Sequence, residues 1–244
     1  MILRKKIPLT FFYTDQELNN TDKKKLLDKG LKLITPKIID YFRELIKCYK
    51  NLAYYQFLGF LLAGKELKTL SQQDLTVPAI RGKYSSKEHC YIFGIQPNKL
   101  IPLATVLHRK MKSEGVLPSS YQRLVKKKKI NEIKEFISQS RGVFPTNIII
   151  SFEPKGKFFN PSGKSVNDIS FGELKLPRKY QSITVIDGQH RLFAYDGLEA
   201  AEKDLIYVIG FERMPVDNQI KTFVNINEKQ TKVSSSLMCT LSLA

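Results

Sequence analysis

The chain has 244 residues, of which 42% are hydrophobic, including 15 Phe and 11 Tyr. That content is enough to bury a substantial core in one large or two small domains, and it argues against a disordered chain. Lysine and arginine number 40 against 23 acidic residues, a formal charge of +17. Such a charge attracts polyanions and makes DNA the leading candidate partner; surface lysine that only keeps the protein soluble is the alternative.

The sequence carries no pattern typical of a structural metal site or of nucleophilic catalysis. The three cysteines lie far apart, the three histidines lack zinc spacing, and the doublet His89-Cys90 is interpreted as structural. A Gly-x-Ser-x-Gly elbow is missing as well. We therefore expect no bound metal ion, apart from Mg accompanying a nucleotide.

The longest apolar stretch, residues 52–63, is about half the length needed to cross a bilayer and is predicted to be a buried helix. The amino terminus does not follow the pattern of a secretory leader. The chain is accordingly expected to be cytoplasmic and to have no contact with a membrane.

Residues 1–72 are predicted to form a helical amino-terminal region. Thr21 or Asp22 is a candidate cap for a first helix. This helix would carry Leu26, Leu27, Leu31 and Leu33. A second helix is indicated by apolar residues at helical spacing, namely Ile38, Ile39, Phe42, Leu45 and Ile46.

Residues 73–244 are predicted to form a second unit in which strands and helices alternate. Strands are expected at 77–82 and 91–95 as a hairpin, then at 148–152, 183–186 and 205–211. Helices are expected from Pro102 to about Met111, around Ile130 to Ile137, over 216–227, and as a last short helix capped within 234–236; a Gly- and Pro-rich loop spans 153–172. This order predicts an α+β fold with a mixed sheet flanked by helices.

Four lysines, Lys126, Lys127, Lys128 and Lys129, precede or open the helix that carries Ile130. Positive charge at a helix amino terminus opposes the helix dipole, so the run does not serve helix stability. We interpret it as a set of candidate DNA phosphate contacts, with Arg123 and Arg81 as further candidates; a solvated charge run is the alternative.

The most informative segment is 183–195, in which the β-branched run ending at Ile186 meets Asp187-Gly188-Gln189-His190-Arg191 and then a helix-compatible stretch. Polar groups are thus aimed at the point where a strand becomes a helix, a place that binds anions. Arg191 would add a forked donor, and His190 a donor or proton acceptor. In the structural alternative, Asp187 caps the helix and Arg191 pairs with a carboxylate.

A second phosphate-binding pattern is rejected. Gly163-Lys164-Ser165 imitates the end of a P-loop, but Phe158 occupies the position where that motif requires its first glycine. The surrounding loop also precedes no helix-compatible segment.

The string Val185 to Leu192 resembles the signature of the DGQHR-domain family, in which DndB regulates bacterial DNA phosphorothioate modification. The resemblance extends over about residues 76–238. Flanking pieces occur in the family's order: 76–82, Tyr121-Gln122-Arg123, 130–137, 144–148, and the closing segment Phe223-Val224-Asn225-Ile226-Asn227.

That family is similar in turn to the ParB and sulfiredoxin superfamily, so the resemblance implies a mixed sheet of ParB/sulfiredoxin-like type in residues 73–244. It also implies a phosphate- or nucleotide-binding role for Gly188, Gln189, His190 and Arg191, with Asp187 as an orienting or metal-facing carboxylate. Asn225 and Asn227 of the closing segment are further candidates. Related proteins continue beyond the closing segment, so the domain is expected to be a compact or carboxyl-terminally truncated form.

Two classes of function follow from the resemblance. The leading hypothesis is a DNA-binding regulatory or accessory protein of a DNA-modification or phage-defence system, in which the turn binds a phosphate of DNA or of a nucleotide. The alternative is a nucleotide hydrolase or nuclease with Asp187, His190 and Arg191 as catalytic residues and a nucleoside triphosphate with Mg as cofactor. DNA-modification proteins and a second copy of the chain are further candidate partners, and a purely structural signature in an interaction subunit is the third hypothesis.

Overall fold

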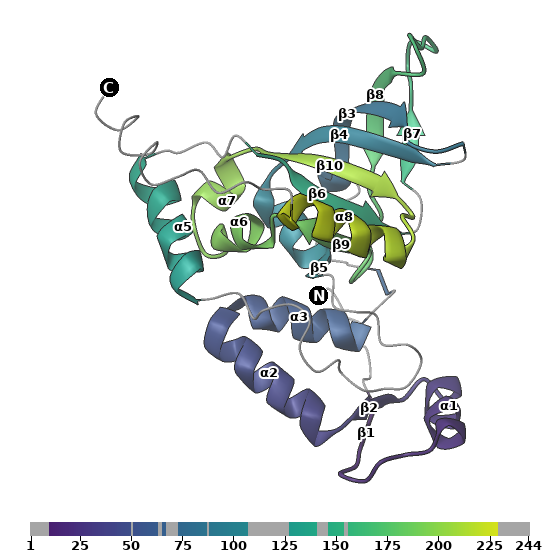
Figure 1. The fold of residues 1–244 in the computed structure, drawn as a ribbon, viewed down its shortest axis with the longest axis vertical. Coiled ribbons are helices and arrows are strands. Elements are labelled where there is room, and N and C mark those ends of the chain that lie inside the picture. Colours follow the sequence, from purple (N-terminus) through teal and green to yellow (C-terminus); the bar gives the residue numbers. More distant parts are fainter. Residues whose placement is uncertain are drawn as a thin grey trace, which may run out of the picture.

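The computed structural model describes residues 10–49, 51–62, 65–66, 73–86, 88–106, 127–140, 146–153 and 156–228. A large, curled mixed sheet with flanking helices forms the body of the molecule, and α1, α2 and a small two-stranded sheet lie beside it (Figure 1). The predicted α+β class with a mixed sheet is therefore confirmed.

Helices and strands alternate along the described parts of the chain. The helices are α1 (Asn20–Asp28), α2 (Pro36–Tyr49), α3 (Asn51–Leu62), α4 (Pro97–Leu100), α5 (Lys127–Ser140), α6 (Gln189–Ala194), α7 (Ala200–Lys203) and α8 (Val216–Glu228), with 3-10 turns η1 (Gln73–Leu75) and η2 (Ile101–Leu103). The strands are β1 (Phe11–Tyr13), β2 (Lys32–Ile34), β3 (Thr76–Lys83), β4 (His89–Ile95), β5 (Ala104–Val106), β6 (Ile148–Phe152), β7 (Lys157–Phe159), β8 (Ser170–Lys175), β9 (Ile183–Asp187) and β10 (Ile206–Glu212).

The large sheet has the strand order β5-β9-β6-β10-β4-β3-β8-β7. Strands β3 and β4 pair antiparallel, as expected for the hairpin, and β10 pairs antiparallel with β4 and parallel with β6. Strand β9 lies between β6 and the edge strand β5. The signature segment therefore ends inside the sheet, where its neighbours on both sides fix its position.

One face of the sheet carries the main core. Residues that alternate along the strands, such as Phe93, Ile150, Val185 and Val208, join helix residues in one apolar cluster. The helix contributions are Ala53, Leu100, Ile130, Ile137, Leu192 and Phe193. On the opposite face α8 packs across β9 (Figure 1), where Ile186 is 1% exposed. The signature strand is consequently covered on both faces.

The apolar stretch predicted as a buried helix is α3. Gln56, the polar residue within it, is buried and donates from Nε2 to the carbonyl oxygen of Ala104 at 3.0 Å. Phe42 of α2 contacts Phe57 edge-on, with ring centroids 4.9 Å apart. Within the described ranges, none of the helices is long and apolar enough to span a membrane.

The first helix differs from its prediction at both ends. Asn19 is the cap, because its Oδ1 accepts from the backbone N–H of Asp22 at 2.8 Å and its amide donates back to the Asp22 carboxylate. Helix α1 stops at Asp28, and Gly30 follows with a φ of 68°. Leu33 consequently lies in β2, paired in parallel with Phe12 of β1. The helical spacing of the leucines had predicted a longer helix than the one that ends before Gly30.

Two other predicted elements are also corrected. The stretch from Pro102 is a 3-10 turn followed by β5, because Ala104, Thr105 and Val106 find a parallel partner in β9; Leu107 and Met111 lie outside the described residues. The predicted loop over 153–172 contains β7 and the start of β8, which pair antiparallel. The Gly, Pro and Asn residues of this segment predicted a loop, but pairing between two short strands gives it regular structure. The segment 234–236 also lies outside the described ranges.

Gly172 of β8 provides a test of the β7–β8 pairing. A Cβ at this position would collide with the carbonyl oxygen of Phe159 and lie 2.8 Å from Cζ of Phe158. We expect Gly172→Ala to lower the free energy of unfolding by about 1–3 kcal/mol, measured by urea denaturation.

Gly82→Ala on β3 is the matched control. There a Cβ would meet only Sγ of Cys90, at 3.8 Å, which is ordinary van der Waals contact. We expect this variant to unfold at the wild-type midpoint or slightly above it, since alanine loses less backbone entropy. Equal effects of the two substitutions would contradict the described pairing.

Candidate phosphate-binding site at the end of strand β9

The signature segment forms the predicted strand, turn and helix. Strand β9 ends at Asp187, Gly188 adopts a φ of 89°, and α6 begins at Gln189. A Cβ at Gly188 would lie 3.1 Å from Cγ1 of Ile148 and 3.3 Å from its Cα, in a backbone conformation that side chains rarely adopt. Glycine is thus required both by the turn and by the closeness of β6.

Asp187 does not cap the helix, contrary to one alternative from the sequence. Gly188 is the N-cap and has no side-chain capping bond. Asp187 instead accepts a hydrogen bond at Oδ2 from Nη2 of Arg191, at 3.0 Å. The other half of that alternative, an Arg191–carboxylate pair, is what the structure contains.

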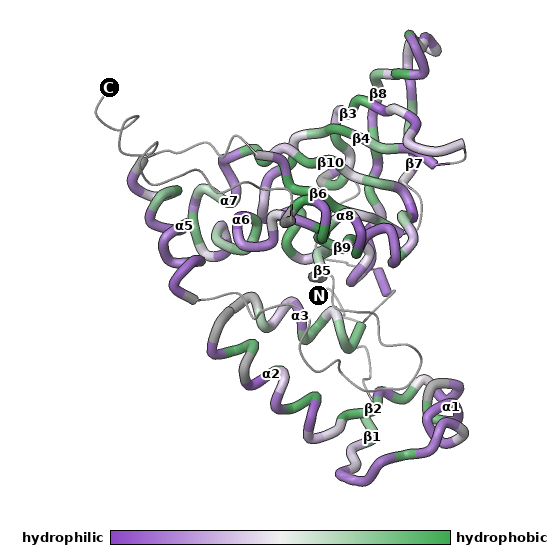
Figure 2. Tube along the Cα trace, viewed as in Figure 1, coloured by the Kyte–Doolittle hydropathy of each residue, from purple (hydrophilic) through white to green (hydrophobic). Residues whose placement is uncertain are grey.

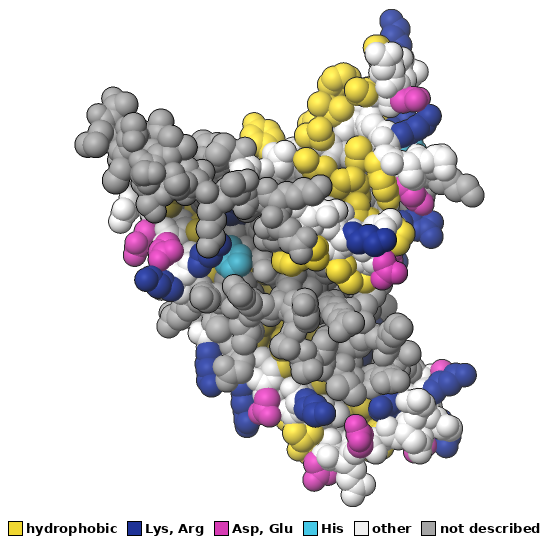
Figure 3. Space-filling model, viewed as in Figure 1, with side chains coloured by type: hydrophobic (Ala, Val, Ile, Leu, Met, Phe, Trp, Pro, Cys, Tyr) yellow, Lys and Arg dark blue, Asp and Glu magenta, His cyan; other side chains and the backbone are white. Residues whose placement is uncertain are grey.

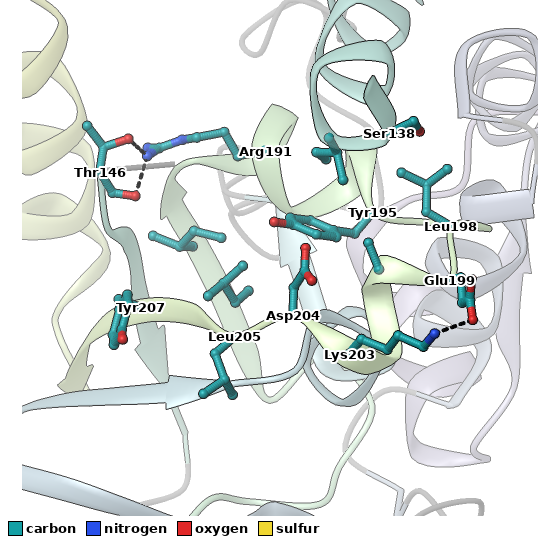
Figure 4. A pocket seen from close by; sticks show the side chains of 14 residues that line it. Ser138, Thr146, Arg191, Tyr195, Leu198, Glu199, Lys203, Asp204, Leu205 and Tyr207 are labelled. Carbon is teal, nitrogen blue, oxygen red and sulfur yellow. Dashed lines mark hydrogen bonds and ion pairs between the residues drawn. The ribbon is translucent and has the colours of Figure 1, made fainter. Parts of the chain in front are cut away.

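Arg191 connects the turn to the start of β6. Its Nη1 donates to the carbonyl oxygen of Thr146 at 2.7 Å and also to the Thr146 hydroxyl (Figure 4). The side chains of Arg191 and Asp187 are 17% and 26% exposed, so solvent reaches the pair only partly. Three of the five guanidinium N–H groups take part in these bonds. These bonds hold the guanidinium in place.

His190 is half-buried beside this pair. Its pKa is lowered from the ordinary value of 6.5 to about 4, mainly by burial and also by the positive charges of Lys129 and Arg191, while the charge of Asp187 opposes the shift. The imidazole is therefore neutral at pH 7. It can accept a proton or a hydrogen bond, but it adds no positive charge to the site.

Lys134 of α5 donates from Nζ to the carbonyl oxygen of Asp196, just after α6, at 2.7 Å, so α5 lies beside the helix that follows the turn. Helix α5 packs against α6, with Ile130 and Ile137 buried, while Lys128 and Lys129 are exposed at its first turn. Two segments about 60 residues apart in sequence thus meet, so that the basic start of α5 supplies the positive charge that His190 lacks.

Gln189 contains an unsatisfied acceptor. Its Oε1 is buried and has no hydrogen-bond partner in the part of the chain that the structure describes. A buried acceptor without a partner costs free energy, on the order of 1–3 kcal/mol. A ligand that donates a hydrogen bond here would recover that cost.

A groove of about 650 Å³ adjoins Arg191 (Figure 4). Arg191 and Thr146 line one side, while Leu205 and Tyr207 of the β10 segment line another. Tyr195, at its floor, donates a hydrogen bond to Asp204, which together with burial raises the pKa of the tyrosine. The volume falls in the range of small-ligand sites, about 300–1,000 Å³.

The remaining predicted residues are distributed unevenly around this site. Helix α8 follows β10 and packs on β9 (Figure 1), and Asn225 is exposed near the carboxyl-terminal end of this helix. Arg81 lies elsewhere, four strands away in the order of the sheet, with its guanidinium carbon 4.4 Å from the ring centroid of Phe158. Arg123 and Lys126 lie outside the described residues, as do the side chains of Lys127 and Asn227.

Neither the contact of Thr146 with Arg191 nor the electrostatic effect of Lys129 on His190 was predicted from the sequence. Thr146 lies 45 positions before Arg191, and only the pairing of β6 with β9 brings the two together. Across the described residues, no group of three or more His, Cys, Asp and Glu side chains is placed to hold a metal ion. The partner that the structure gives to Asp187 is Arg191.

Comparison with known protein families identifies the family to which the chain belongs. The model of the DndB family, described as DNA-sulfur modification-associated, matches residues 77–241, more than half of the chain. The chain belongs to the DndB family. The match begins within β3 and includes β9, the turn and α8, so the resemblance expected from the signature is confirmed. Neither the curated proteins nor the solved structures contain a match. Family membership connects the chain with DNA-sulfur modification.

The position of Lys129 can be tested through the titration of His190. We expect the imidazole of His190 to titrate near pH 4 in NMR spectra, and its pKa to rise in Lys129→Gln, because one of the charges that disfavour protonation is removed. Lys128→Gln is the matched control, an exposed neighbour with the same change of charge. A rise of equal size in both variants, or in neither, would show that α5 does not face the turn as described.

Proposed function

We propose that the chain is a DNA-binding regulatory or accessory protein of a DNA-sulfur modification system, and that it contacts DNA phosphates through the β9–α6 turn and the start of α5. The observation that carries this proposal is the packing of α5 against α6, with Lys128 and Lys129 exposed in the first turn of α5. It joins a basic run to the turn in one surface. The formal charge of +17 provides the long-range attraction to DNA.

The two segments complement each other chemically. Helix α6 has only six residues, so its dipole is weak, and the charge of Arg191 is largely balanced by Asp187. The turn alone would therefore attract phosphate weakly. Lys128 and Lys129 add net positive charge, while Arg191 and the first backbone N–H groups of α6 supply directed donors. The lysines of α5 would attract the phosphate, and the donors of the turn would fix its position.

We also infer that the sheet is of ParB/sulfiredoxin-like type. The support is the arrangement of the signature, in which a strand inside a mixed sheet runs through a glycine turn into a short helix. In that superfamily such a turn handles nucleotide phosphates, so a bound nucleotide is an alternative source of the phosphate. The groove beside Arg191 has room for one.

One observation favours the hydrolase or nuclease hypothesis as a second candidate. Because the pKa of His190 is lowered to about 4, its imidazole is available as a proton acceptor at neutral pH. Asp187 and Arg191, directly beside it, would orient the reacting groups and stabilise developing charge. The same atoms therefore serve either binding alone or binding with water activation.

DNA binding is tested by the salt dependence of affinity. Binding of a labelled duplex is measured by fluorescence anisotropy between about 50 and 200 mM salt, for the wild type and for the double variant Lys128→Gln/Lys129→Gln. We expect the variant to bind more weakly. The slope of log K against log salt should fall by about 0.9 for each phosphate that is no longer neutralised, roughly 1.8 in total.

Lys24→Gln/Lys29→Gln is the matched control. It removes the same charge from exposed positions in and just after α1, in the amino-terminal region. We expect only a small change in slope from the altered net charge. A control variant whose affinity falls as much as that of the α5 variant would mean that binding depends on overall charge and not on the proposed surface.

A turnover assay separates binding from catalysis. Release of inorganic phosphate from each nucleoside triphosphate with Mg, and nicking of a supercoiled plasmid, are followed for the wild type and for His190→Gln. The binding proposal predicts no turnover in either protein. Turnover that His190→Gln abolishes would replace it with the hydrolase or nuclease function.

A further inference from the structure

The groove beside Arg191 contains an acidic side chain that the proposed phosphate contact does not use. Asp204 follows helix α7 directly and lines the groove, where it is partly exposed (Figure 4). Its carboxylate accepts a hydrogen bond from the hydroxyl of Tyr195, which is 3% exposed, and its backbone N–H donates to the carbonyl oxygen of Ala200 at 2.9 Å. Side chain and backbone together hold Asp204 in one position.

Among the described residues that line the groove, no cation pairs with this carboxylate. Arg191 pairs with Asp187, and Lys203 pairs with Glu199 at 2.5 Å. Asp204 has no ion-pair partner within the described ranges. A carboxylate offers about four acceptor sites, of which the tyrosine hydroxyl occupies one. The remaining sites can accept N–H groups of a ligand.

The signature segment connects this carboxylate with the turn. Arg191 and Tyr195 are four residues apart, a spacing that places them on the same side of α6, and both line the groove. The end of β9 and the starts of β6 and β10 lie at one end of the sheet, because β6 pairs antiparallel with β9 and parallel with β10. One groove therefore joins the arginine of the turn to the fixed carboxylate.

The rest of the groove indicates the kind of ligand that fits. Apolar side chains, among them Ile148, Leu198 and Leu205, form most of its remaining wall, together with the ring of Tyr207. Such a wall favours a flat ligand with apolar faces. Among the described residues, no group of three or more His, Cys, Asp and Glu side chains could hold a metal ion here. Two N–H groups side by side on the edge of a flat ligand would match the two oxygens of the carboxylate.

We propose that the groove binds a guanine base, whose N1–H and 2-amino group donate hydrogen bonds to Asp204. Guanine carries these two donors side by side on its Watson–Crick edge. Adenine and cytosine place a ring-nitrogen acceptor beside their amino group, and thymine has a single N–H between two carbonyl oxygens. Each of these bases would turn an acceptor toward the carboxylate. Asp204 is thus the residue that determines specificity.

This inference rests on the proposed function for the phosphate, which the turn would hold while the base occupies the groove. The guanine belongs either to a free nucleotide or to a DNA strand from which it is rotated out of the base stack. Both present the same edge to Asp204, so the test includes one measurement for each source.

The free nucleotide is tested by isothermal titration calorimetry of the full chain with guanosine, inosine and adenosine monophosphate. Inosine monophosphate carries hypoxanthine, which differs from guanine only by the missing 2-amino group. We expect the guanine nucleotide to bind roughly tenfold more tightly than the other two, or better, because a bidentate contact to a base discriminates by about 1–3 kcal/mol.

A change of specificity distinguishes recognition by Asp204 from a role in folding. Xanthine has a carbonyl oxygen in place of the 2-amino group, and an asparagine amide can donate to that oxygen. We therefore expect Asp204→Asn to bind guanosine monophosphate more weakly than the wild type and xanthosine monophosphate more tightly. Asp217→Asn, which removes the same charge from an exposed position on α8, is the matched control and should keep the wild-type preference.

The DNA source is tested with labelled single strands of thymine that contain one central guanine or one central hypoxanthine. Fluorescence anisotropy should show tighter binding of the guanine strand by the wild type and no preference in Asp204→Asn. A preference in this measurement without binding of guanosine monophosphate would assign the base to DNA, and the reverse would assign it to a nucleotide.

The proposal is overturned by either of two results. In the first, neither the guanine nucleotide nor the guanine strand binds more tightly than its hypoxanthine counterpart. In the second, a guanine preference survives in Asp204→Asn or is lost equally in Asp217→Asn. Duplex binding that still depends on Lys128 and Lys129 would then leave the proposed function intact. Guanine preference in a protein that does not bind duplex DNA would contradict the proposed function alone.

Discussion

The bridge that Arg191 makes between Asp187 and Thr146 is the interaction on which the candidate site depends. It ties the end of β9 to the start of β6 and fixes where the guanidinium lies. Gly188 makes this geometry possible, because any side chain there would meet Ile148. The bridge also limits the site, since a carboxylate already balances the arginine charge. The proposed binding of a phosphate therefore requires another cationic element, and α5 carries Lys128 and Lys129 exposed in its first turn.

The sequence was informative where local signals agree with tertiary pairing. The β3–β4 hairpin, the helix α3 and the strand, turn and helix around Gly188 all follow from periodicity and glycine chemistry, although α3 leaves Tyr54 and Phe57 exposed. The sequence was misleading where long-range pairing decides the structure. Strand β5 pairs with β9, which lies far along the chain, and β7 pairs with β8 across a polar loop. The contact of Thr146 with Arg191 has the same origin, because no local pattern records which strands become neighbours.

The molecule separates its two kinds of surface. Positive charge meets the signature turn where α5 packs on α6, whereas the row of residues across the large sheet that includes Ile92 is apolar, with Glu173 in the adjacent row. Figure 3 shows hydrophobic side chains gathered over β3, β4 and β10, and Figure 2 shows the same strands as largely hydrophobic. Tyr207 lies on the same face of the sheet as Ile92 and also lines the groove beside Arg191, so the two surfaces adjoin along β10.

The central claim, that the turn binds a phosphate of DNA through Arg191, is tested most directly by duplex affinity in Asp187→Asn. Asparagine keeps the shape and an acceptor, but it removes the charge 3.0 Å from the guanidinium that competes with phosphate. The control is Asp217→Asn, which removes the same charge from an exposed position on α8. We predict tighter binding by Asp187→Asn than by the control. Equal or weaker binding would show that the Asp187–Arg191 pair only supports the fold.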